Sequence, residues 1–346
     1  MSISTDEIAP AQTALPGDLA DDQTVARLQQ AREQLQAEMA KVVVGQDAVI
    51  EALLVTLLCR GHALMVGVPG LGKTLMARTL ARSLNMEYKR IQFTPDLMPS
   101  DITGTDVLME DPDNGRRRLE FLPGPLFANF LLADEINRAP PKTQAALLQA
   151  MQELEVTVGR QTYPLAPPFF VVATQNPVEQ EGTYPLPEAQ LDRFMLNIPV
   201  AYPTPAEEVD IVKNTTTNAE VTLGPVLTAD EVRKLQVLVR GVPVANDVVN
   251  YAVTLVGFSR PEAVAKSHDD IHRFIRYGAS PRASQYLVLG AKARALLKGR
   301  FHVDFEDIKA MAVPVMRHRL VLNFHARADG VDADEVIRRI LQQVRV

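Results

Sequence analysis

Two spacings of apolar residues alternate along the first part of the chain. Residues 25–42 carry apolar side chains at helical spacing, and a second helical stretch follows over residues 47–59 after a break at "VVVGQ". Residues 143–153 repeat the same spacing further along. Each of these stretches predicts a helix that buries one face.

Four short segments between the predicted helices have the features of strands. They are residues 62–67, 88–93, 129–135 and 167–176. Most are apolar at successive positions, which is expected for strands covered on both faces. Strands that alternate with helices in this way predict an α/β fold with a parallel sheet flanked by helices.

The pattern changes near Tyr202, where "YPTPAEE" opens a helix with acidic residues in its first turn. From there onward the spacing is helical and predicts no strand. We therefore predict an α/β domain over residues 25–203 and an all-helical domain over residues 204–346. Residues 1–24 are acidic and polar, and we interpret them as a disordered tail.

Composition narrows the class of protein. The chain has 346 residues and a net charge of −6, which argues against a dedicated nucleic-acid binder. It has neither a signal peptide nor a long apolar block, and its one cysteine, Cys59, allows no internal disulfide. We expect a cytoplasmic protein without a membrane span. His268 and His272 lie four positions apart, and a solvated helix face explains them better than a metal site.

The string "GVPGLGKT" at residues 67–74 predicts a phosphate-binding loop, because a strand precedes it and a helix follows it. Backbone N–H groups of such a turn can surround phosphate oxygens, Lys73 adds positive charge, and Thr74 offers a hydroxyl to Mg²⁺. The alternative is a chance glycine turn. The candidate nucleotide-binding residues here are Gly67, Pro69, Gly70, Leu71, Gly72, Lys73, Thr74 and Leu75.

Two carboxylates close the strand at residues 129–135. Ligands of open α/β sheets collect at the carboxyl ends of the strands, so we predict that Asp134 holds Mg²⁺ and that Glu135 acts as general base on a water. Asn176 ends the next strand. If that strand lies between the other two, Asn176 would orient the attacking water beside the terminal phosphate. A solvated strand end and an ordinary Asn-Pro turn are the alternatives.

At this point the chain resembles a known family. "GVPGLGKT", "LLADEIN", "ATQNP", "LDRF" and "SPRA", in this order, resemble AAA+ ATPases, and the long strings at 93–104, 122–153 and 182–194 resemble the MoxR branch. The resemblance implies a P-loop AAA+ core with a helical lid, and ATP with Mg²⁺ bound between the subunits of a ring, typically a hexamer. It also implies a protein client, and a partner with a von Willebrand factor A domain.

The resemblance assigns further residues. Arg193 resembles the arginine finger, which reaches the ATP of the next subunit; a helix-end cation or a partner of Asp192 is the alternative. Arg282, in the first turn of a helix capped by Ser280, resembles a lid arginine that touches the ATP of its own chain. Val43, Val44 and Gln46 resemble the adenine-side segment. Arg138 is a second candidate for the subunit interface.

Two segments interrupt the alternation of strands and helices. Residues 104–124 contain "GRRRLEF", and residues 155–165 alternate like a hairpin around Gly159 and Arg160. They resemble inserts that project toward the ring axis in this clade. The leading hypothesis is an ATPase that remodels a client protein, and the alternatives are a nucleic-acid motor and a nucleotide-controlled scaffold that does not hydrolyse ATP.

Overall fold

The computed structural model describes residues 22–110, 117–178, 182–217, 221–261 and 271–345. Residues 1–21 of the predicted tail lie outside the described residues. Helix α1 (Asp22–Ala40) begins before residue 25. Residues 22–24 therefore belong to the first helix and not to a tail.

A five-stranded parallel sheet forms the centre of the first domain, in the order β2-β5-β8-β1-β9. Its strands are β1 (Ala63–Val66), β2 (Tyr88–Gln92), β5 (Phe130–Asp134), β8 (Phe170–Gln175) and β9 (Leu196–Pro199). Strand β8 pairs with β5 on one side and with β1 on the other. The predicted α/β class is confirmed, and β8 lies between β5 and β1, which is the condition on which the expected role of Asn176 depends.

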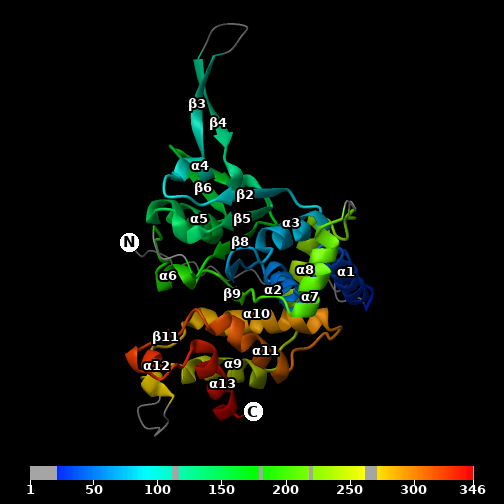
Figure 1. Cartoon of the computed structure of the whole chain (residues 1–346), viewed down its shortest axis with the longest axis vertical. Helices are drawn as coiled ribbons and strands as arrows, with labels where there is room; N and C mark the ends of the chain where they lie inside the picture. The colour runs from blue at the N-terminus through cyan, green and yellow to red at the C-terminus, as the bar shows by residue number, and fades with distance from the viewer. Residues whose placement is uncertain (1–21, 111–116, 179–181, 218–220, 262–270, 346) are drawn as a thin grey trace, which may run out of the picture.

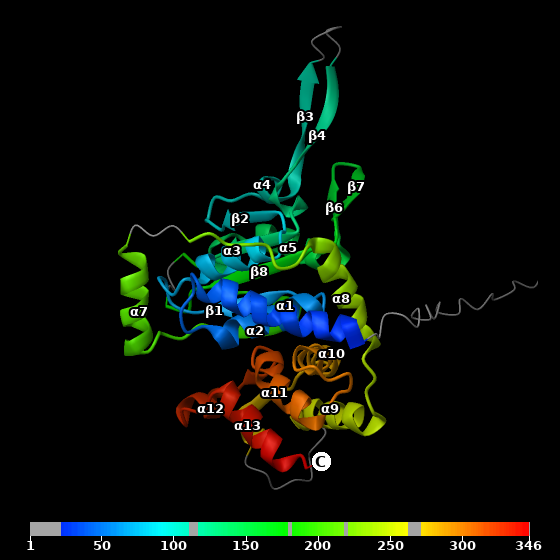
Figure 2. The ribbon, with the colours of Figure 1, turned by 90° about the vertical axis from the view of Figure 1, so that its right-hand side faces the viewer.

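Helices cover both faces of this sheet, which explains the continuous apolar runs (Figures 1 and 2). In β5, Phe130 and Leu132 join the core under α1, α2 and α3, while Leu131 and Ala133 join the core under α4 and α5. Successive side chains of a strand point to opposite faces, so both sets are buried. The covering helices are α2 (Asp47–Leu58), α3 (Lys73–Ser83), α4 (Pro99–Thr103) and α5 (Pro141–Glu153).

The second part of the chain is helical, as predicted, and its core is continuous with that under α2. Its helices are α7 (Pro205–Thr215), α8 (Ala229–Gly241), α9 (Asn246–Phe258), α10 (Pro281–Leu297), α11 (Phe305–Met316), α12 (Phe324–Ala328) and α13 (Ala333–Gln343). The expectation that it contains no strand is corrected by β10 (Ile275–Tyr277) and β11 (Val321–Leu322), which pair antiparallel. Strands this short are too brief for a period of two to show in the sequence.

Two hairpins project from the same end of the first domain (Figures 1 and 2). One joins β3 (Gly104–Glu110) to β4 (Arg117–Pro123), and the other joins β6 (Glu155–Val158) to β7 (Gln161–Pro164). Phe121 of the first hairpin stacks on Tyr163 of the second, with ring centroids 4.0 Å apart. The predicted hairpin around Gly159 is confirmed, and the stacked rings join the two inserts near their bases.

His62, at the start of β1, joins three elements through its ring. Its Nδ1 accepts a hydrogen bond from the Val171 N–H, and its Nε2 lies 3.1 Å from the Met151 carbonyl oxygen. Because Nδ1 accepts, the ring is neutral and Nε2 donates. Burial lowers the pKa of His62 from its ordinary 6.5 to about 4, although the bond to Met151 opposes this shift.

This pKa makes the stability of the fold depend on pH. Between pH 6.5 and 4 the unfolded chain binds a proton at His62 that the folded chain does not, so acid favours unfolding. We expect His62 to lower the free energy of unfolding by about 2 kcal/mol between pH 7 and pH 5. Urea unfolding at both pH values measures the loss, which should shrink in His62→Gln. An equal loss in both proteins would contradict this role.

Candidate functional site

The loop at residues 67–72 leaves the carboxyl end of β1, and α3 begins directly after it at Lys73. Gly70 and Gly72 have φ values of 85° and 74°, in the left-handed region that favours glycine. A Cβ at Gly67 would lie 2.8 Å from the Val200 carbonyl oxygen. Glycine is therefore required at these three positions of the motif, for conformation at two and for space at one.

Lys73 and Thr74 extend from the first turn of α3. Lys73 Nζ donates to the carbonyl oxygens of Gly67 and Val68, at 2.5 and 2.7 Å. Burial lowers the pKa of Lys73, while the carboxylates of Asp134 and Glu135 act in the opposite direction. A cation that is partly desolvated in this way is suited to bind phosphate oxygens.

Asp134, the last residue of β5, contacts side chains of helix α3 and of strands β8 and β2. Its carboxylate accepts hydrogen bonds from Thr74 at 3.1 Å and Thr174 at 2.6 Å, and it forms an ion pair with Arg90 at 2.8 Å. Arg90 was not predicted from the sequence. It lies on β2, and only the pairing of β2 with β5 brings it to Asp134.

Glu135 follows in a left-handed conformation, with φ of 57°. Its N–H donates to Thr174 Oγ1, which fixes the turn that ends β5. Its carboxylate accepts hydrogen bonds from Gln92 at 2.9 Å and Arg138 at 3.0 Å. Gln92 was also missed in the sequence, for the same reason as Arg90.

Asn176 ends β8, between β5 and β1, and is 4% exposed. Its Oδ1 accepts a hydrogen bond from the Val178 N–H. Its buried Nδ2 has no hydrogen-bond partner among the described residues. A buried amide donor without a partner is costly, so this N–H group indicates a missing acceptor beside the loop.

These groups surround one cavity of about 420 Å³. Its wall contains Lys73, Thr74, Asp134, Glu135 and Asn176, together with Arg90 and Gln92. A second cavity, of about 260 Å³, shares Gly70, Leu71, Gly72 and Leu75 with the first and is otherwise lined largely by apolar groups. Val43, Val44 and Gln46 lie in the second cavity. The two cavities together fit a nucleoside triphosphate, with the phosphates in the polar cavity and the base in the apolar one.

Arg193 does not reach this cavity. It lies just before β9, whose first residue Leu196 pairs with Ala63, the first residue of β1. It is therefore at the amino edge of the sheet, whereas the glycine loop leaves the carboxyl edge, across strands that span about 13 Å. The side chain of Arg193 has no hydrogen bond or ion pair with another described residue and is half-buried. A cation of this kind is available for a group on another molecule.

Arg282 also lies away from the cavity, which differs from the expectation that it touches the nucleotide of its own chain. Its guanidinium lies 3.4 Å from the Asp192 carboxylate, next to Arg193 in sequence. Ser280 at the start of the same helix donates to Asp192 at 3.0 Å. These contacts hold the N-terminus of α10 against the amino edge of the sheet, and they explain why the predicted placement is not found.

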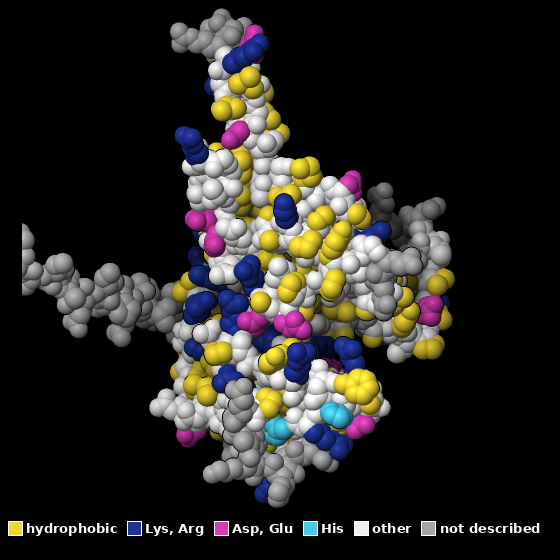
Figure 3. All heavy atoms as spheres, turned by 90° about the vertical axis from the view of Figure 1, so that its left-hand side faces the viewer, with side chains coloured by type: hydrophobic (Ala, Val, Ile, Leu, Met, Phe, Trp, Pro, Cys, Tyr) yellow, Lys and Arg dark blue, Asp and Glu magenta, His cyan; other side chains and the backbone are white. Residues whose placement is uncertain are grey.

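Arg319 completes this cluster and was not predicted. It is 6% exposed, pairs with Asp192 at 2.7 Å, and donates to carbonyl oxygens of Phe194 and Met195. Lys and Arg side chains gather along the boundary between the two domains on this face of the molecule (Figure 3). The second domain is thus attached to the segment that carries Arg193.

Loss of Arg319 should destabilise the protein. Arg319→Met removes the most buried donor of the Asp192 carboxylate, which keeps Ser280 and Arg282, and a donor of the nearby carbonyl groups. Removal of one partner from a buried pair costs roughly 3–5 kcal/mol. Urea unfolding gives the free energy. Arg338→Met, at an exposed pair with Glu335, is the control and should cost less than about 1 kcal/mol. Equal effects of the two substitutions would exclude a structural role for the Arg319 cluster.

Comparison with known proteins gives the family. A sequence model of the "ATPase family associated with various cellular activities (AAA)" matches residues 62–196, and a model of the AAA lid domain matches residues 268–340. The chaperone MoxR1 of Mycobacterium tuberculosis is 44% identical over 311 residues, which are 89% of this chain and 80% of that protein. The chain belongs to the MoxR family of AAA+ ATPases.

Two further relatives agree with this assignment. Protein MoxR of Paracoccus denitrificans is 36% identical over 307 residues, which cover 83% of this MoxR-family chain and 88% of that protein. A crystal structure from Cytophaga hutchinsonii matches with a TM-score of 0.85 and 40% identity, over 94% of this chain and 97% of that chain. The predicted family and fold of this MoxR-family protein are confirmed.

Membrane-spanning helices and clusters of metal ligands are both absent from the described residues. Within the described ranges, no helix combines the length and the apolar character that a membrane crossing requires. Those ranges also contain no group of three or more His, Cys, Asp or Glu residues that could hold a metal ion. His268 lies outside the described residues, and the His272 ring lies 2.7 Å from the Phe258 carbonyl oxygen.

Proposed function

We propose that this MoxR-family protein hydrolyses ATP with Mg²⁺ at sites that a neighbouring copy completes, and that the cycle remodels a protein client. One observation carries the hydrolytic part of the proposal. Lys73, Thr74, Asp134, Glu135 and Asn176 line a single cavity beside the glycine loop. The groups that we assign to phosphate binding, to Mg²⁺ and to the base thus line the same cavity.

The residues fit Mg²⁺ and a triphosphate. Mg²⁺ takes oxygen ligands and usually keeps several waters, with one or two protein groups and phosphate oxygens as the remaining ligands. The Thr74 hydroxyl and the Asp134 carboxylate lie within 3.1 Å of each other and could both serve. When bound, the ion would offset charge on the phosphates. Lys73 would exchange the carbonyl groups of the loop for phosphate oxygens.

Glu135 would take a proton from the attacking water, and the Asn176 amide would orient that water. For this step Glu135 must have a free oxygen, yet Gln92 and Arg138 both donate to its Oε2. Its other oxygen, Oε1, has no such bond with another described residue and is the atom to which we assign the proton. The apolar cavity beside Val43 and Val44 would hold the base.

The arginine must come from another chain. Arg193 lies at the edge of the sheet opposite the glycine loop, so the site of one protomer lacks this cation. Arg282 shares Asp192 with the Arg193 segment, and we infer that both arginines face the neighbouring protomer together. A head-to-tail contact of this type gives a ring when its rotation closes, and we propose the hexamer typical of the family.

Protein concentration tests this arrangement. We expect phosphate release per chain to rise with protein concentration and to level off when assembly, followed by light scattering, is complete. The reason is that a protomer without a neighbour has the base but no arginine. Equal turnover per chain across dilution, with assembly changing, would show that each chain hydrolyses ATP alone.

The two hairpins are the proposed client surface. Large apolar side chains are exposed on the β3–β4 hairpin, with Leu119 at 71% and Leu108 at 60%. Arg117 and Arg118 lie beside them and, among the described residues, pair with Glu110 and Glu120 of the same hairpin at exposed sites. An exposed apolar patch is suited to unfolded or flexible protein segments. A relative named chaperone supports this assignment, while a partner with a von Willebrand factor A domain stays a prediction.

A further inference from the structure

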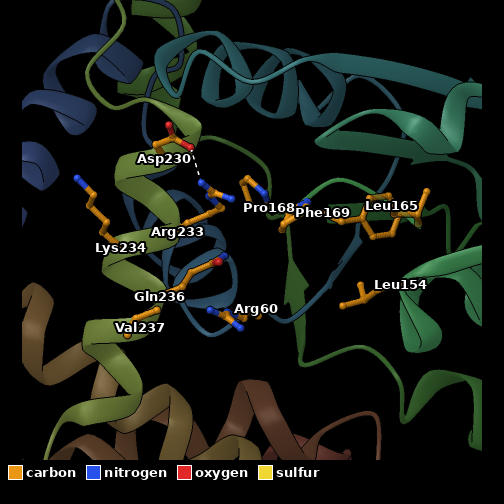
Figure 4. A pocket seen from close by; sticks show the side chains of 11 residues that line it. Arg60, Leu154, Leu165, Pro168, Phe169, Asp230, Arg233, Lys234, Gln236 and Val237 are labelled. Atoms are coloured by element: carbon orange, nitrogen blue, oxygen red, sulfur yellow. Dashed lines mark hydrogen bonds and ion pairs between the residues drawn. The ribbon is translucent and has the colours of Figure 1, made fainter. Parts of the chain in front are cut away.

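A cleft of about 500 Å³ lies at the amino edge of the sheet, apart from the nucleotide site. One wall is α8, with Arg233, Lys234 and Val237, and the other is formed by the segment from Pro167 to Phe169 and by Leu165 (Figure 4). Arg60 closes one end of the cleft. The cleft therefore combines an apolar wall with a cationic one, and neither is used by the proposed hydrolysis.

The cleft is lined by more cationic side chains than acidic ones. Arg233 pairs with Asp230 at 2.8 Å, but Arg60, Lys234 and Arg240 have no ion pair with another described residue. Arg240 lies near enough to Arg60 to lower the pKa of Arg60, after the larger effect of burial. Like charges held together in this way repel one another, so an anionic partner would be stabilising.

The start of the chain has the complementary chemistry. Residues 1–21 contain four carboxylates, at Asp6, Glu7, Asp18 and Asp21, and the first Lys or Arg of the chain is Arg27. The same segment carries apolar side chains that could lie on the apolar wall. They are Ile3, Ile8, Leu15 and Leu19.

Helix α1, which directly follows residues 1–21, is held beside the cleft. Arg27, in the second turn of α1, donates to Glu231 of α8 at 3.3 Å and to the Val226 carbonyl oxygen at 3.0 Å. Glu231 directly follows Asp230, which lines the cleft. Leu15 lies seven positions before Asp22, and a chain of that length spans up to about 25 Å. A tethered segment has an effective concentration of order mM, so weak contacts suffice.

We propose that residues 1–21 of the chain bind in this cleft, with their carboxylates against its cations and their leucines against its apolar wall. The occupied cleft would join α8 of the second domain to Leu154 and Leu165, the residues that flank the β6–β7 hairpin. It would thereby hold the second domain against an insert of the first. The proposal does not depend on ATP hydrolysis.

Disulfide trapping in the full-length protein tests the proposal. The only native thiol, Cys59, is buried and its pKa is raised by burial, so it reacts slowly. We expect Leu15→Cys/Val237→Cys to form a disulfide within one chain under mild oxidation, seen by mass spectrometry of peptides. The control pair is Leu15→Cys/Arg327→Cys, with the second cysteine on α12, and it should give at least about 10-fold less product.

Charge reversal separates specific binding from chance encounter. Arg233→Glu/Lys234→Glu, in the trapping pair, should lower the rate of disulfide formation about 10-fold, and roughly 0.5 M salt should do the same. The matched control, Arg327→Glu/Arg338→Glu, reverses two exposed cations on α12 and α13 and should leave the rate unchanged. All four residues are exposed, so both variants should fold, which thermal unfolding checks.

Two results would overturn the proposal. Equal trapping rates at Val237 and Arg327, or rates indifferent to charge reversal, would mean that the segment does not occupy the cleft. Disulfide-linked dimers formed in place of the product within one chain would assign the cleft to the segment of a neighbouring copy.

Discussion

Glu135→Gln should lower steady-state ATP hydrolysis by about 10²–10⁴-fold and leave ATP binding intact. The amide has nearly the shape of the carboxylate but cannot take a proton from water. Lys73, Thr74 and Asp134, which we assign to phosphate and Mg²⁺, are unchanged by the substitution. Phosphate release measures the rate, and titration with a fluorescent ATP analogue measures the affinity.

A matched substitution shows whether the effect is specific. Glu33→Gln, on the exposed face of α1, removes the same charge away from the cavity and should keep the rate within about twofold. If Glu135→Gln keeps the rate of the unmodified protein, the base is another group. If it loses affinity together with rate, Glu135 serves binding and the assignment of Oε1 as proton acceptor fails.

The same variant separates the proposed roles of the adjacent acids. Asp134 accepts hydrogen bonds from two threonines and pairs with Arg90, so it organises the loop as well as the metal position. Among the described residues, the hydrogen bonds of the Glu135 side chain are confined to one carboxylate oxygen. Substitution of Asp134 should therefore weaken nucleotide binding, whereas substitution of Glu135 should not. This contrast distinguishes a general base from a structural carboxylate.

The sequence was most informative where one short segment determines its own surroundings. The continuous apolar run of β5 predicts burial on both faces of the sheet, because successive side chains point to opposite faces. The loop "GVPGLGKT" needs glycine at positions 70 and 72 because the φ values there are positive. Both features follow from residues close together in the chain. Strand β8 lies between β5 and β1, which is the arrangement that the role considered for Asn176 requires.

It was least informative where a role depends on register or on domain packing. Arg90 and Gln92 are ordinary polar residues of a strand until β2 pairs with β5 and places Gln92 opposite Asp134. The sequence around Arg319, "RHRL", does not indicate that this arginine is buried among carbonyl groups. Arg282 was expected at the nucleotide, but Asp192 holds it at the other edge of the sheet. No local pattern encodes the position of one domain on another.

Arg193→Ala should lower hydrolysis by roughly 10³-fold or more, with ATP affinity nearly unchanged, because the arginine stabilises transition-state charge on a neighbouring site. Lys73→Ala should also be inactive, since it loses phosphate binding, yet it keeps Arg193. The two inactive proteins are therefore complementary if the site is shared. In a ring mixed at random in equal amounts, a site is complete when an Arg193→Ala chain precedes a Lys73→Ala chain, which occurs at about one quarter of the interfaces.

Recovery of about one quarter of the unmodified activity is thus the expected result of mixing, whatever the number of chains in the ring. Mixing Arg193→Ala with the double variant Lys73→Ala/Arg193→Ala supplies the same number of chains but no arginine, and it should recover nothing. An arginine that acted within its own chain would give no recovery in either mixture. Because Arg193 and the glycine loop lie at opposite edges of one rigid sheet, we expect the first mixture alone to be active.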